Sequence, residues 1–112
     1  MRILVTGGRA YRDSNRIDQV LSEVFGLNDC LIQGGASGAD GLAYLWASRR
    51  GIAVCTFLAN WDQYGPAAGP IRNGWMIEHA QPDLVIAFPG GDGTADCVQR
   101  AREAGVEVRL VD

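Results

Sequence analysis

The chain has 112 residues, a formal net charge of −3 and a hydrophobic share of 47%, which fits one globular domain with its own core. All 10 basic residues are arginines, so chemistry that requires a lysine, such as a P-loop or a Schiff base, is excluded. The acidic balance and the absence of a basic run argue against a sequence-independent grip on nucleic acid, which needs many phosphate contacts.

No apolar stretch approaches the roughly 20 residues that span a bilayer, and the chain begins with a strand-like segment rather than a signal peptide. We therefore expect a cytoplasmic protein with no membrane partner. Cys30, Cys55 and Cys97 are odd in number and widely spaced, which argues against a disulfide framework or a zinc site. We expect buried, reduced thiols at these positions and no dedicated metal site.

The first half of the chain alternates apolar strand-like runs with helical periodicity. Strands are predicted at 2–6, 30–33 and 52–57. Between the first two, apolar residues recur at helical spacing from Ile17 to Phe25, with Asp13 or Ser14 as N-cap and Gly26 as the stop. A second helix is predicted from the spacing of Leu42, Leu45 and Trp46, and it ends at Gly51.

The second half continues the alternation after an irregular segment. Residues 58–70 show no period and are predicted to form a loop. A third helix follows, with Pro70 in its first turn and with Ile71, Trp75 and His79 on its apolar stripe. A strand at 83–88, a fourth helix that ends at Gly105 and a last strand at 106–111 complete the pattern.

This alternation predicts an α/β fold. The strands are continuous apolar runs and every crossover is long enough for a helix, as in a parallel sheet covered on both faces. We predict one Rossmann-like domain over residues 1–112, with a doubly wound parallel sheet of about five strands and helices on both faces.

The 15 glycines are about twice the usual share, and most of them follow the carboxyl ends of three strands. Those ends share one edge of a parallel sheet, so the three loops should converge there. A loop without side chains that enters a helix presents free N–H groups beside the positive end of the helix dipole, which suits phosphate. Arg9 and Thr94 would add a guanidinium and a hydroxyl. Tight turns that need glycine are the competing explanation for each loop taken alone.

The segments GGRAYRD, QGGASGADGLAYLWA, GPIRNGWM and IAFPGGDGTAD together resemble the SLOG superfamily, named for the Smf/DprA and LOG proteins, and in particular its small YspA-like branch of uncharacterised bacterial and phage proteins. The similarity covers nearly the whole chain in order. It implies a Rossmann-like fold, a homodimer and a ligand built from a nucleoside phosphate.

The segment PGGDGT is similar to the PGGxGTxxE motif of LOG proteins, which are nucleoside-monophosphate phosphoribohydrolases. The resemblance implies that Gly90, Gly91, Gly93 and Thr94 hold a phosphate and that Arg72 lies near the ribose and phosphate. The glutamate of that motif has no counterpart, because Cys97 stands in its place.

The missing glutamate matters because N-glycosidic cleavage passes through an oxocarbenium-like state that a carboxylate stabilises. Asp96 is one residue early and points about 100° away around the helix. Asp40 and Asp92 are therefore the candidate catalytic residues. Their competing interpretations are a first-turn helix acid for Asp40 and a solvated turn residue for Asp92. Together they could also hold Mg²⁺ brought in with a phosphate.

Trp61 and Tyr64, in the irregular segment, offer aromatic faces on which a base could stack. Trp46 and Trp75 lie on helical stripes, and we expect them in the core or on a dimer surface. The complete predicted ligand site comprises Gly7, Gly8, Arg9, Gly34, Gly35, Ala36, Gly38, Asp40, Trp61, Arg72, Asn73, Pro89, Gly90, Gly91, Gly93 and Thr94.

Three functions follow from these residues. The favoured one is a sensor or sequestering module that binds a nucleoside phosphate or an ADP-ribose-like signal. The alternative is a nucleoside 5′-monophosphate phosphoribohydrolase with a substituted carboxylate. The third is binding of single-stranded DNA, as in DprA relatives, which the acidic charge disfavours.

Overall fold

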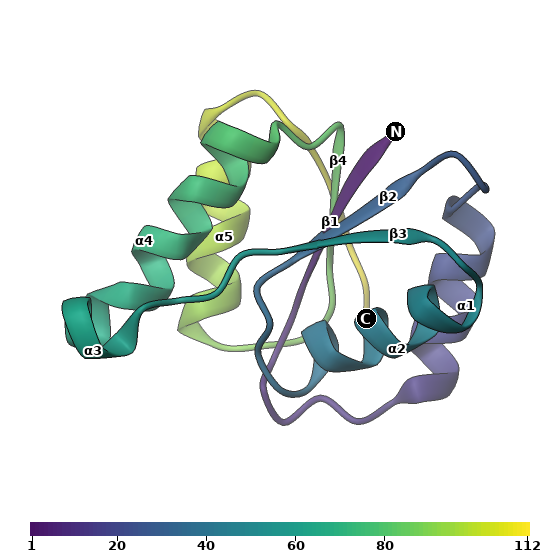
Figure 1. The fold of residues 1–112 in the computed structure, drawn as a ribbon, viewed down its shortest axis with the longest axis horizontal. Coiled ribbons are helices and arrows are strands. Elements are labelled where there is room, and N and C mark those ends of the chain that lie inside the picture. Colours follow the sequence, from purple (N-terminus) through teal and green to yellow (C-terminus); the bar gives the residue numbers. More distant parts are fainter.

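The computed structural model describes residues 1–112 and contains one five-stranded parallel sheet with the strand order β3-β2-β1-β4-β5 (Figure 1). This is the doubly wound order of a Rossmann-like fold, so the predicted fold class is confirmed. The strands are β1 (Arg2–Thr6), β2 (Cys30–Gln33), β3 (Ala53–Thr56), β4 (Leu84–Ala87) and β5 (Glu107–Leu110).

Helices connect the strands and cover both faces of the sheet, as predicted (Figure 1). The longer helices are α1 (Ser14–Val24), α2 (Ala39–Arg49), α4 (Ala68–Trp75) and α5 (Asp92–Glu103). The crossover from β3 to β4 also contains the short α3 (Trp61–Tyr64), a 3₁₀ turn η1 (Gly65–Ala67) and a π-helical turn η2 (Met76–Ala80).

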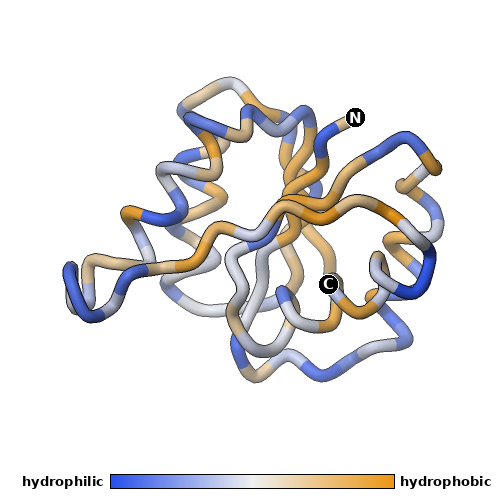
Figure 2. The backbone as a smooth tube through the Cα atoms, in the orientation of Figure 1, coloured by the Kyte–Doolittle hydropathy of each residue, from blue (hydrophilic) through white to orange (hydrophobic).

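Two apolar clusters flank the sheet, because successive side chains of a strand point to opposite faces. Ile3 and Val5 of β1 belong to the cluster beneath α1 and α2, whereas Leu4 belongs to the cluster beneath η2 and α5. Figure 2 shows the apolar residues concentrated in the central strands. The core therefore lies between the sheet and the helices on each of its faces.

The segment 58–70 differs from the predicted loop. Asn60 caps α3, because its Oδ1 accepts the backbone N–H of Gln63 at 3.1 Å, and α4 already begins at Ala68. Elements of three and four residues are too short to show a hydrophobic period, which is why the sequence pattern missed them. Pro70 does lie in the first turn of α4, as predicted.

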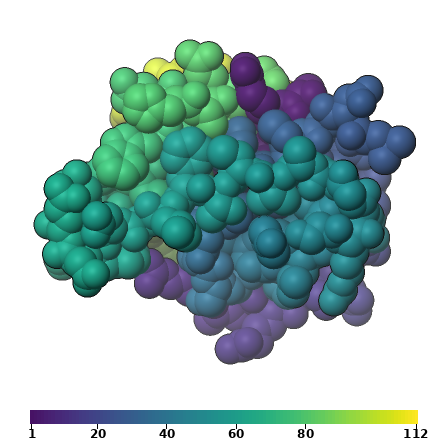
Figure 3. All heavy atoms as spheres, viewed as in Figure 1, coloured from purple at the N-terminus to yellow at the C-terminus, as the bar shows by residue number.

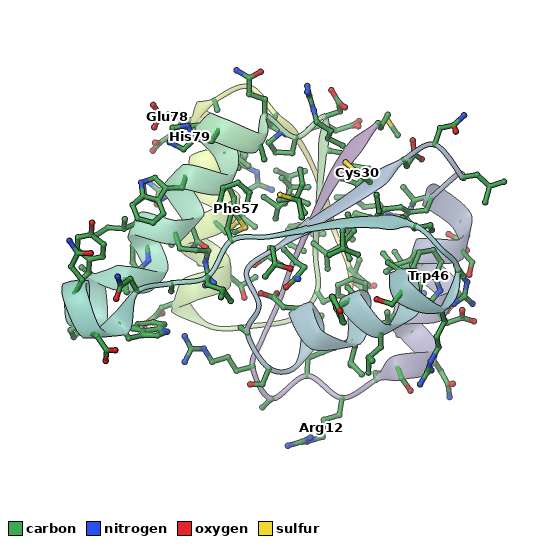
Figure 4. All side chains as sticks on the ribbon, in the orientation of Figure 1. Arg12, Cys30, Trp46, Phe57, Glu78 and His79 are labelled. Carbon is green, nitrogen blue, oxygen red and sulfur yellow. The ribbon has the colours of Figure 1, made fainter.

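The structure also tests the predictions for the three cysteines, His79 and Trp46. Cys97 is buried, as predicted, but Cys30 is half-buried and Cys55 is exposed because β3 is an edge strand. His79 is exposed at the outer end of η2 (Figure 4) rather than on an apolar stripe. Trp46 belongs to the core, as expected. None of the helices combines the length and apolar character needed to cross a membrane.

Candidate ligand-binding site

A cleft of about 410 Å³ lies at the carboxyl ends of the strands. The loops after β1, β2 and β4 form part of its wall, and the segment from α3 to η2 forms the rest. In the sheet, β1 is paired with both β2 and β4, so the direction of winding reverses beside β1, which is where open α/β sheets bind ligands. The lining residues are Thr6, Gly7, Gly8, Arg9, Ala36, Asp40, Trp61, Pro66, Gly69, Pro70, Arg72, Asn73, Met76, Gly91, Asp92, Gly93 and Thr94.

Close packing of the loops on each other explains several glycines. The N–H of Gly8 donates to the carbonyl of Pro89 at 2.9 Å, and a Cβ at Gly90 would lie 2.7 Å from the nitrogen of Gly8. Gly38 has a φ of +75°, and a Cβ there would overlap the carbonyl of Gly8. These contacts draw the predicted loops together, but Gly38, Pro89 and Gly90 themselves do not line the cleft.

The beginning of α5 is open. Gly91 is its N-cap without a side-chain cap, and a Cβ at Gly91 or Gly93 would have no neighbour within 4 Å. The first N–H that bonds within the helix belongs to Ala95, which donates to the Gly91 carbonyl at 3.0 Å. The preceding N–H groups of α5 therefore have no partner within the helix. With the Thr94 side chain they form a corner of the cleft that is rich in hydrogen-bond donors, an arrangement that suits an anion.

Arg72 and Asn73, in the second turn of α4, hold the loops in register. Arg72 is only 8% exposed; its Nη1 donates to the carbonyl of Gly34 at 2.5 Å and its Nε to Asn73 Oδ1 at 3.1 Å. Asn73 Nδ2 donates to the carbonyl of Gly93 at 3.1 Å and to Asp96 Oδ2 at 3.0 Å. The pair therefore joins the β2 loop to α5. These bonds leave Arg72 Nη2 available to a ligand.

Asp40 is the buried carboxylate of the cleft. Its Oδ2 accepts the N–H groups of Gly34 and Ala36 at 3.1 and 3.3 Å, which shapes the β2 loop. Burial raises the pKa of the Asp40 carboxyl above its ordinary value, although these hydrogen bonds and the charge of Arg72 oppose the shift. Since both bonds end on Oδ2, Oδ1 remains for a ligand. Asp92, the second predicted acid, is exposed at the first turn of α5.

A cation–π pair stands beside the cleft. The Arg9 guanidinium lies over the Trp61 ring at 4.9 Å from its centroid, and both residues line the cleft and a second cavity of about 280 Å³. Gly34 and Gly35, which were predicted for the ligand site, line only this second cavity. Figure 3 shows the segment that contains α3 projecting from the body of the molecule. Arg12 points away from the body in Figure 4 and lines neither cavity.

Cys97, at the place of the LOG glutamate, lies behind the cleft wall rather than in it. Its side chain is fully buried in the cluster beneath α5, and burial raises the pKa of its thiol to about 11, partly offset by a hydrogen bond with Thr6. It is therefore a neutral thiol at pH 7. Asp96, predicted to point elsewhere, indeed bonds Asn73 and Arg100 instead of lining the cleft.

Sequence reasoning missed five lining residues: Thr6, Pro66, Gly69, Pro70 and Met76. Three of them, Pro66, Gly69 and Pro70, lie in the segment 58–70, whose short helices carry no periodic signal, and Met76 begins η2. Gly69 could have indicated this part of the cleft, because a glycine next to a proline at the start of a helix leaves room for a neighbouring aromatic ring. A Cβ there would lie 3.2 Å from Trp61.

Known proteins resemble this chain in sequence. The sequence model of the YAcAr family, described as the YspA, cpYpsA-related SLOG family, matches residues 1–64. The chain is 35% identical to the Gene 61 protein of Mycobacterium phage D29 over 119 residues, which is 96% of this chain and 93% of that protein. The chain belongs to the YspA, cpYpsA-related family of the SLOG superfamily.

A solved structure shares the fold. DNA processing protein A (DprA) from Streptococcus pneumoniae aligns with 99% of this chain at a TM-score of 0.76 and 20% identity. The alignment covers 50% of the DprA chain, so this chain spans about half the length of that relative. At this level of identity the likeness concerns the fold.

Proposed function

We propose that this protein binds a nucleotide-derived ligand, a nucleoside phosphate or an ADP-ribose-like molecule, and acts as a sensor or sequestering module. The observation that carries the proposal is the uncapped start of α5, where Gly91 and Gly93 leave free N–H groups open to the cleft. A phosphate there would meet the positive end of the helix dipole and the hydroxyl of Thr94.

Charge and size support the same ligand class. Arg9 and Arg72 bring guanidinium groups to the cleft, and guanidinium is the cation best suited to bidentate contacts with phosphate. The volume of about 410 Å³ falls within the ~300–1,000 Å³ of small-molecule sites. Ligand class, oligomeric state and cytoplasmic location all remain predictions.

Thr94→Val tests the phosphate corner. The hydroxyl forms no hydrogen bond within the chain, so its removal should leave the melting temperature nearly unchanged. We expect AMP affinity, measured by isothermal titration calorimetry, to fall about fivefold, the effect of one lost hydrogen bond. Adenosine, which lacks the phosphate, serves as the control and should bind both proteins equally. Equal AMP affinity for the two proteins would contradict the assignment.

A second function, phosphoribohydrolase activity, is favoured by one observation, the buried Asp40 carboxyl in the cleft. A carboxylate at that place could stabilise the oxocarbenium-like state of N-glycosidic cleavage. The neutral thiol of Cys97 cannot replace the LOG glutamate, and for that reason we prefer binding without hydrolysis. Mg²⁺ held by Asp40 and Asp92 is part of this second proposal.

Incubation with nucleoside monophosphates, with and without Mg²⁺, followed by chromatography of the free base, separates the two functions. We expect AMP to be recovered intact. Release of adenine that disappears in Asp40→Asn would establish the hydrolase instead, and the same variant would then still bind AMP.

A further inference from the structure

Two cavities meet at the Arg9–Trp61 pair. The main cleft and the second cavity have four lining residues in common: Arg9, Ala36, Trp61 and Arg72. The second cavity continues past them to the β2 loop and to Leu58 and Ala59, which follow β3. The stacked pair is therefore a partition between two compartments of one depression.

The second cavity is too small to be an independent site. Its volume of about 280 Å³ lies below the ~300–1,000 Å³ of typical small-molecule pockets. As an extension of the main cleft, it would accept a further group of the same ligand. The partition can open, because Arg9 is an exposed side chain held over the ring at 4.9 Å, and an exposed cation–π contact contributes only about 0.5–1 kcal/mol.

The charges that line the two cavities indicate the chemistry of the linker between the part of the ligand in the main cleft and the part in the second cavity. The second cavity has no carboxylate in its lining, and its only charged residues are Arg9 and Arg72 at the partition. The main cleft, by contrast, also contains Asp40 and Asp92. Two guanidinium groups at the boundary favour an anionic linker there.

The walls of the second cavity indicate the group beyond the linker. Leu58 is 70% exposed and Trp61 44% exposed, so they offer apolar surface to a ligand. Ser37 adds a hydroxyl, now donated to the Arg9 carbonyl at 3.2 Å. Apolar surface with a few polar groups suits the ring of a sugar or a base.

We propose that the ligand is a nucleoside diphosphate whose second phosphate carries a further sugar or nucleoside, with the terminal group in the cavity between Ser37 and Leu58. This inference rests on the proposed nucleotide binding. One phosphate occupies the start of α5, the charge of the second lies at the Arg9–Arg72 boundary, and Trp61 faces both compartments.

Calorimetry with AMP, ADP and ADP-ribose as probes tests the inference. ADP-ribose should bind at least about tenfold more tightly than AMP or ADP, which corresponds to about 1.4 kcal/mol. Ser37→Trp places a large ring in the second cavity without touching the main cleft, and should remove this advantage while AMP affinity stays the same. Ser37→Ala, the matched comparison, keeps the space open but removes the hydroxyl, and should lower ADP-ribose affinity by only about threefold, the effect of one lost hydrogen bond.

Ala59→Trp fills the same cavity from the other wall and should reproduce the effect of Ser37→Trp. The test therefore does not depend on the correct folding of a single variant. Two results would contradict the role of the second cavity and leave the proposed function standing. One is that AMP binds and ADP-ribose binds no more tightly, and the other is that both tryptophan variants leave ADP-ribose affinity unchanged. If none of the three probes binds, the proposed function fails as well.

Discussion

At the scale of single residues, some side chains that line the cleft also hold its loops in place. Asp40 and Arg72 both line the cleft and are nearly buried, and each holds a loop through backbone groups while one of its terminal atoms makes no hydrogen bond within the chain. Burial lowers the pKa of the Arg72 guanidinium, and the charge of Asp40 opposes the shift. Because such residues serve both stability and binding, the effect of a substitution on the stability of the fold has to be measured separately from its effect on ligand affinity.

The pH dependence of Asp40→Asn measures the contribution of the Asp40 carboxyl to stability. Since burial raises the folded-state pKa of Asp40 above the ordinary value of 3.8, the protonated carboxyl stabilises the fold at low pH, and that contribution is lost as pH rises through the folded-state pKa. Asparagine does not titrate, and its Oδ1 can accept the same backbone N–H groups. We expect the stability of the variant relative to the parent protein to increase with pH above 3.8 and then to level off.

Urea unfolding at a series of pH values measures this difference. A relative stability that is constant over the acidic range would mean that Asp40 titrates alike in the folded and unfolded chain. The matched control is Glu103→Gln, which removes a carboxylate from an exposed position of the surface.

At the scale of elements, glycines divide into those that pack loops together and those that open the site. Gly38 combines a positive φ with close contact to the β1 loop, whereas Gly51 has a similar φ of +69° and no neighbour within 4 Å of a Cβ. A comparison of substitutions at Gly38 and Gly51 therefore distinguishes the cost of backbone strain from the cost of lost loop packing.

Gly51→Ala should cost roughly 1 kcal/mol of unfolding free energy, the strain of left-handed backbone for a residue with a Cβ. Gly38→Ala adds overlap with the Gly8 carbonyl and should cost at least about 3 kcal/mol. Chemical denaturation of both variants checks the difference. Equal costs would show that the β1 and β2 loops are not held by this contact.

At the scale of the whole molecule, the fold is shared with DprA but the charge is acidic, with a net value of −3. A compact cleft of about 410 Å³ suits a small ligand more than a polymer. We predict that oligonucleotides bind more weakly than mononucleotides at 0.15 M salt. Fluorescence anisotropy with a labelled single strand measures this. Tight oligonucleotide binding that falls steeply with salt would instead support the DNA-binding alternative.

The amino-acid sequence by itself determined the alternation of strands and helices, the parallel sheet and the three glycine-rich corners on its carboxyl edge, because these depend on local periodicity and on a topology with few solutions. It also indicated most of the cleft lining, including Arg9, Arg72 and Thr94.

Only the tertiary structure decided which glycines pack and which stay open, since this depends on contacts between loops that are far apart in the chain. It likewise decided that Asn73 holds α5, that Arg9 stacks on Trp61 and that the segment 58–70 folds into short helices beside the cleft. Such long-range contacts leave no periodic trace in the sequence, because each depends on the position that the whole sheet gives to its loops.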